Sequence, residues 1–148
     1  MESFKQFISE VSYEEGGTDI EKTLSKLPKK HKDLLRGFKI KFEKGSTLDN
    51  GNKYVGEMDP ENKTISIAAP YNYSREWTML HEIGHIVYDK FMDENLRDKW
   101  QKLVIKTKDK AKQSAEELFC HAYASYFAKN KVVVHTHPEW IEFLKNNF

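Results

Sequence analysis

The chain is organised around the segment Thr78-Met79-Leu80-His81-Glu82-Ile83-Gly84-His85-Ile86-Val87-Tyr88. His81 and His85 are four residues apart, so an α-helix places them on one face about one turn apart. Their imidazoles can then bind a single tetrahedral metal ion. Glu82 lies about 100° further round the helix, where it can reach a metal-bound water without being a ligand. This pattern indicates zinc-dependent hydrolysis, in which the ion lowers the pKa of its water towards ~7 and the glutamate accepts the proton.

The residues around the motif predict a buried helix. It is apolar on nearly every side because of Trp77, Leu80, Ile83, Ile86, Val87 and Phe91. Two histidines and a glutamate inside such a helix need partners. Gly84 costs roughly 1 kcal/mol relative to alanine in a helix interior, which indicates close approach of another backbone. In the alternative interpretation, His81 and His85 are ordinary helix histidines.

Length and composition restrict the class of protein. The chain has 148 residues, enough for one domain (1–148) with a hydrophobic core. Its 24 Lys and Arg balance 23 Asp and Glu, so charge does not favour a nucleic acid or a membrane as partner. The single cysteine, Cys120, excludes an internal disulfide and a Cys-rich zinc site. With no secretory signal or transmembrane stretch in view, we expect a cytoplasmic monomer, although a mature form that has lost its leader would look the same.

Three short helices are predicted in residues 1–37, and His31, which lies among lysines, is expected to be a solvated surface residue. A sheet is predicted for residues 38–68. It begins with the alternating strand of Phe38, Ile40 and Phe42 and continues as a hairpin of 54–58 and 64–68 around a turn at Asp59-Pro60. The motif helix follows at 74–91.

Residues beyond the sheet are predicted to be helical. Ser74 or Asn72 caps the motif helix, and further helices begin near Asp93, at 114 (ending at 129) and at Pro138. The basic stretch from Lys106 to Lys112 is interpreted as a solvated segment or, alternatively, as a rim that favours acidic substrates.

A third metal ligand must come from elsewhere in the chain. The longer zincin pattern would place Gly at 88 and His at 91, and the chain has Tyr88 and Phe91, which excludes that class. Glu116 and Glu117 are the downstream carboxylates on a convincing helix.

Helical phase favours Glu117 over Glu116. Glu117 shares one face with His121, Ala124 and Ala128, and the small residues on that face allow close packing against Gly84. Glu116 is expected to point away, towards Tyr123 and Phe127, as a helix N-terminal charge. A rival interpretation engages the Glu117 carboxylate in a capping box with Ser114.

These motifs carry a resemblance to a known family. His81-Glu82-Ile83-Gly84-His85 followed by Glu117-Leu118-Phe119-Cys120-His121-Ala122-Tyr123 resembles the catalytic domain of anthrax lethal factor and its relatives, the Pro-Pro endopeptidases. The resemblance spans about residues 20–130 and implies zinc ligands His81, His85 and Glu117, with Glu82 as general base. The repressor-cleaving cytosolic metallopeptidases of mobile elements are also similar.

The chain departs from the family at two positions. His121 stands where the family has a second glutamate, and Lys110 stands where it has a tyrosine thought to stabilise the oxyanion. Candidates for oxyanion or supporting roles are therefore His121, Tyr71, Tyr73, His135 and His137; a plain loop is the other interpretation of the last two.

Together these observations predict an α+β, zincin-like domain with a small, mostly antiparallel sheet packed against the motif helix. The expected function is zinc-dependent hydrolysis of an extended peptide or protein segment. The resemblance places strand 64–68 at the cleft rim, where substrate would add as one more strand. The alternative is a catalytically silent, zinc-stabilised regulatory or binding module, favoured by Lys110; the presence of Glu82 argues against it.

Overall fold

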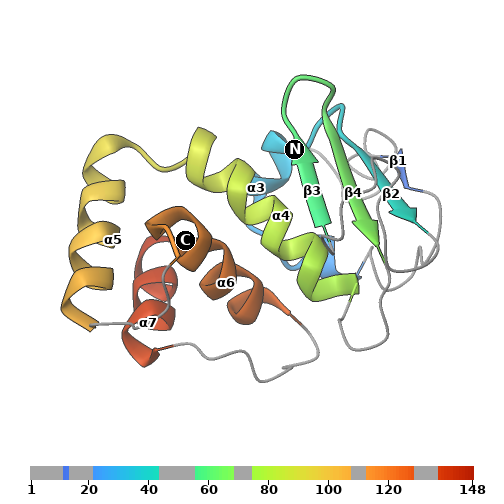
Figure 1. Cartoon of the computed structure of the whole chain (residues 1–148). Coiled ribbons are helices and arrows are strands. Elements are labelled where there is room, and N and C mark those ends of the chain that lie inside the picture. The colour runs from blue at the N-terminus through green and yellow to red at the C-terminus, as the bar shows by residue number, and fades with distance from the viewer. Residues whose placement is uncertain (1–11, 14–21, 44–55, 69–74, 108–112, 129–136) are drawn as a thin grey trace.

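The protein has an α+β architecture in which one long helix separates a small sheet from the C-terminal helices (Figure 1). The computed structural model describes residues 12–13, 22–43, 56–68, 75–107, 113–128 and 137–148. The strands are β1 (Ser12–Tyr13), β2 (Lys39–Glu43), β3 (Gly56–Asp59) and β4 (Thr64–Ala68). The helices are α3 (Lys29–Leu34), α4 (Arg75–Lys90), α5 (Glu94–Thr107), α6 (Ala115–Phe127) and α7 (Pro138–Asn147).

The predicted elements agree with these bounds to within a few residues. The helices expected at 74–91 and 114–129 correspond to α4 and α6, and the helix expected near Asp93 is α5. The Asp93 carboxylate caps α5 by accepting a hydrogen bond from the backbone N–H of Leu96 at 2.8 Å. The first helix, the cap of α4 and most of the basic stretch lie outside the described residues. No helix of the described ranges combines the length and the apolar character needed to cross a membrane.

The sheet is mixed, so the expectation of a mostly antiparallel sheet was wrong. Its strand order is β1-β2-β4-β3, with β1 and β4 both parallel to β2 and only the β3–β4 hairpin antiparallel. Strand β4, the more apolar strand of the hairpin, lies in the interior of the sheet, and its Ile65 and Ile67 are both fully buried. Strand β3, which carries Glu57 and Asp59, has the charged character of an edge strand.

The strand order also overturns the expected docking place of a substrate. Strand β4 pairs with β2 along all five residues on one side and with β3 on the other. Its backbone is therefore committed to the sheet and cannot accept a peptide as an extra strand.

The predicted hairpin turn is confirmed. The Asp59 carboxylate accepts hydrogen bonds from the backbone N–H groups of Glu61 and Asn62 at 3.0 and 3.2 Å. Lys63 completes the reversal with a φ of 52°. An aspartate that bonds its own backbone two and three residues on stabilises a tight turn.

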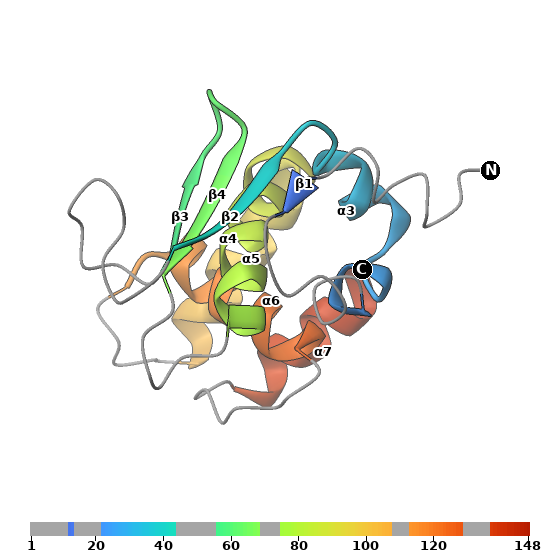
Figure 2. The ribbon, with the colours of Figure 1, turned by 90° about the vertical axis from the view of Figure 1, so that its right-hand side faces the viewer.

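The core lies on both sides of α4. On one side α4 packs on the sheet, and on the other it packs on α6, with α5 and α7 beyond (Figures 1 and 2). Gly84 permits the close contact with α6, because a Cβ added there would lie 3.0 Å from the Cα of Cys120. The backbone approach predicted from this glycine is therefore confirmed.

His31 is buried, so its assignment to the solvated surface was wrong. Only 1% of the residue is exposed, and its Nδ1 lies 2.9 Å from the hydroxyl of Tyr123. The rings of Phe91 and Phe148 contact the imidazole with centroid separations of 5.0 Å each. The neighbouring lysines suggested exposure, but His31 shares its face with the buried Leu35, four residues later.

Candidate metal centre

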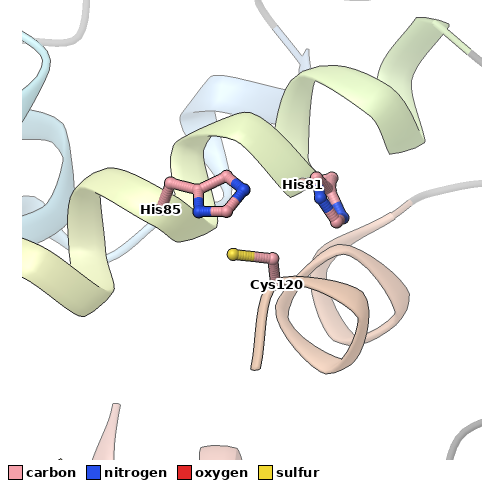
Figure 3. Close-up of side chains that lie close together, drawn as sticks. All are labelled: His81, His85 and Cys120. Carbon is pink, nitrogen blue, oxygen red and sulfur yellow. The ribbon is translucent and has the colours of Figure 1, made fainter. Parts of the chain in front are cut away.

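Helix α4 presents the two motif histidines side by side towards α6 (Figure 3). Their ring centroids are 5.2 Å apart, and their side chains are only 13% and 16% exposed. The i, i+4 spacing places them one turn apart on the face that Gly84 holds against α6. The predicted juxtaposition of His81 and His85 is therefore confirmed.

The Glu117 carboxylate contacts both histidines. Its Oε2 lies 3.1 Å from Nε2 of His81, and its Oε1 lies 3.0 Å from Nε2 of His85. Hydrogen bonds with His81 and His85 lower the pKa of Glu117, so this group is a carboxylate. The sequence prediction that Glu117 faces the motif helix is confirmed.

Ser114 caps α6 without competing for this carboxylate. Its Oγ accepts a hydrogen bond from the backbone N–H of Glu117 at 3.1 Å. The second bond of a capping box, from the Glu117 carboxylate back to the backbone N–H of Ser114, does not form, because this carboxylate contacts the histidines instead. A second anchor lies one residue on, where the indole N–H of the buried Trp100 donates to the carbonyl of Ala115 at 2.7 Å. Both bonds hold the first turn of α6 in position.

Glu116 also reaches the site, so the expectation that it points towards Tyr123 and Phe127 was wrong. Its Oε2 lies 2.8 Å from Nδ1 of His85. Helical side chains lean towards the N-terminus of their helix, and a glutamate has enough rotatable bonds to cross the ~100° that separates it from its neighbour. Helical phase describes Cβ directions and does not fix the end of so long a side chain.

The two carboxylates determine the charge of His85 in this arrangement. Burial disfavours the charged imidazolium, but hydrogen bonds to Glu117 and Glu116 outweigh it and raise the pKa of His85 to about 9. The Nδ1 atom of His81, in contrast to that of His85, is buried and has no hydrogen-bond partner among the described residues. Glu116 thus supports one motif histidine and not the other.

Two overlapping groups of potential ligands meet here. His81, Glu117 and His121 present ligand atoms within 4.8 Å of one another, and so do His81, His85 and Cys120. Sequence reasoning considered Cys120 only for disulfides and Cys-rich sites and missed its place. Its position three residues after Glu117, facing Gly84, was the available signal.

The residues present fit a zinc ion. Ligands in a tetrahedral zinc site with bonds of about 2.0–2.1 Å lie roughly 3.3 Å apart. The contacts from Glu117 to the two Nε2 atoms, at 3.0 and 3.1 Å, are close to that separation. The carboxylate uses a different oxygen for each histidine, so ion binding requires small rotations of these side chains. Two imidazoles and a carboxylate are also a usual ligand set for catalytic zinc.

Glu82 lies beside this cluster but belongs to neither ligand group. The residue is 6% exposed, and burial raises the pKa of its carboxyl group. On its other side is β3, where a Cβ added to Gly56 would lie 3.1 Å from Glu82 Oε1 and 2.8 Å from Thr78 Cγ2. The absence of a side chain at Gly56 therefore provides the space that the Glu82 carboxyl group occupies.

The remaining candidates have different outcomes. His121 joins the site, with its ring centroid 5.0 Å from that of His81. His137 precedes α7 and packs on Trp140 at 4.6 Å, outside both ligand groups. Tyr71, Tyr73, His135 and Lys110 lie outside the described residues.

Comparisons of the chain with protein-family models, with curated proteins and with solved structures found no match.

Proposed function

We propose that this chain is a zincin-like, zinc-dependent endopeptidase whose ion is held by His81, His85 and Glu117. One observation carries the proposal: a carboxylate from a separate helix contacts the Nε2 atoms of both motif histidines with its two oxygens. A chance histidine pair has no reason to attract such a partner. The mixed sheet behind α4 and the resemblance to the lethal factor family agree with it.

The bound zinc would supply a Lewis acid for the scissile carbonyl and lower the pKa of its water. Glu82 accepts the proton of the attacking water and passes it to the leaving amine. Burial raises the pKa of Glu82, which favours the uptake of a proton by this carboxylate. Glu116 holds the imidazole of His85 through Nδ1, so that Nε2 would be the nitrogen that binds the zinc.

An extended substrate segment would bind along β3. Among the described strands, β3 pairs with β4 alone and forms the edge nearest Glu82. Edge strands accept peptides through backbone hydrogen bonds. This position replaces the one expected on β4. A flexible, unstructured protein segment is the substrate class that such an edge takes.

The deciding experiment measures zinc content and peptide cleavage for wild type and Glu82→Gln. We expect about one zinc per chain in both, and a fall of about 10²–10⁴-fold in cleavage for the variant, because the amide cannot accept a proton. Glu142→Gln on the exposed face of α7 is the matched control and should behave as wild type.

Two outcomes would change the conclusion. If Glu82→Gln cleaves a peptide library as fast as wild type, Glu82 is not the general base. If wild type binds zinc tightly but cleaves no member of the library, the alternative of a zinc-stabilised binding module, suggested by Lys110, is preferred.

A further inference from the structure

A thiol is built into the contact between the motif helix and α6. Cys120 is fully buried, and its ligand atom lies within 4.8 Å of those of His81 and His85. Figure 3 shows its sulfur on the side of α6 that faces the motif helix, below the imidazole of His85. It is the only cysteine of the chain.

Gly84 creates the room for this thiol. A Cβ at position 84 would lie 3.2 Å from Cys120 Sγ and 3.0 Å from Cys120 Cα. The sulfur therefore lies against Gly84 of α4, where any larger residue would displace it. Glu117 lies one turn earlier on α6, so the helix offers a carboxylate and a thiol to the same pair of imidazoles.

These two α6 ligands differ in chemical preference. Carboxylate oxygen is a hard ligand, whereas a thiolate is soft and selects thiophilic ions, with which imidazole is also compatible. We propose that His81, His85 and Cys120 form a second ligand set, which binds soft d¹⁰ cations such as Cd²⁺ or Cu⁺ at the same histidine pair. When the sulfur–metal bond forms, the thiol proton leaves to water and no electron is transferred. A soft ion bound in this way uses both zinc-binding imidazoles and so excludes zinc.

The inference rests on metal binding at the histidine pair in the proposed function, but it has a separate readout. The test titrates the metal-stripped full chain with Cd²⁺ and with Co²⁺, and follows thiolate-to-metal charge-transfer absorption. Because the chain has one cysteine, a thiolate band identifies Cys120. Wild type should show the Cd²⁺ band, and Cys120→Ser should lose it.

The affinities give a second measurement. Cys120→Ser and Cys120→Ala should weaken Cd²⁺ binding by about 10-fold or more, and Co²⁺ binding by a smaller factor, because the hard ligands remain. The matched control is Cys120→Ser combined with Gln101→Cys, which moves the thiol to an exposed position of α5 away from the histidines. This variant should bind Cd²⁺ as weakly as Cys120→Ser alone.

The outcomes separate the two proposals. Cd²⁺ binding to wild type without a thiolate band, or with an affinity that Cys120→Ser and Cys120→Ala leave unchanged, would overturn the second ligand set alone. Co²⁺ and Cd²⁺ affinities that are equal in wild type and His81→Ala would overturn the metal site itself and both proposals with it.

Discussion

Two histidines buried in the same small protein have opposite protonation behaviour. His85 of α4 lies between the carboxylates of Glu116 and Glu117, and its pKa is raised to about 9. His31 of α3 is more deeply buried, lies among aromatic rings and has its pKa lowered to about 4 by loss of solvation. Burial disfavours the charged form at both positions, so the partners make the difference.

The two histidines distinguish a candidate metal site from a structural contact. His31 meets the hydroxyl of Tyr123 through Nδ1, while its Nε2 is buried and has no partner among the described residues. Such a histidine is a neutral packing residue. His85 instead has a carboxylate at each ring nitrogen. These two carboxylates concentrate negative charge at the place where a cation would bind.

The largest expected effect is the loss of metal in His85→Ala. If His85 is one of the three proposed ligands of a zinc ion bound with on the order of 10 kcal/mol, its removal should raise the Kd for zinc about 100-fold or more. His31→Gln is the matched histidine variant and should bind zinc as wild type does. Competition with a chromophoric chelator measures both values. Equal zinc affinity in the two variants would erase the distinction between the histidines.

The second effect is a pH dependence of stability that comes from His31. Its pKa is lowered from 6.5 to about 4 in the folded state, so the unfolded chain takes up the proton first as the pH falls. The stabilisation is complete above pH 6.5 and is lost progressively down to about pH 4. The full loss is on the order of 3 kcal/mol.

Urea unfolding of wild type and His31→Gln at several pH values measures this effect. The glutamine keeps a polar contact to Tyr123 but does not titrate, so the stability difference between the proteins should shift in its favour from pH 7 to pH 4. Carboxylates elsewhere affect both proteins equally and cancel. A difference that stays constant over this interval would show that His31 is not held neutral by burial.

The comparison also shows what the sequence could predict. Periodicity and spacing describe local geometry well. They predict the bounds of α4 and α6, the hairpin, and the pairing of His81 and His85 with Glu117. The position of β2 beside β4 cannot be predicted in this way, because strand order depends on tertiary packing between distant segments. The burial of His31 could have been predicted, because this residue lies four positions before the apolar Leu35 on the same helix face. The reach of Glu116 could not, because a flexible side chain chooses its partner only after the helices have packed.

The smallest effect concerns the contact that sequence reasoning missed. Nδ1 of His85 lies 2.8 Å from Glu116 Oε2, and a hydrogen bond donated there keeps the proton on Nδ1, so that Nε2 is the nitrogen that gives up its proton to a metal. Glu116→Ala frees the ring to rotate and to change tautomer, so we expect the Kd for zinc to rise about 10–100-fold, as for other such supporting carboxylates. Glu116→Gln should recover part of that loss, since the amide oxygen still accepts from Nδ1–H although it has no charge. Glu142→Ala on α7 controls for the removal of an acidic side chain. If only the loss of negative charge matters, Glu116→Ala and Glu116→Gln should lose equal zinc affinity. If positioning of the imidazole matters, Glu116→Ala should bind zinc more weakly than Glu116→Gln. Equal zinc affinity in Glu116→Ala and wild type would mean that Glu117 and the packing of α4 suffice to orient His85.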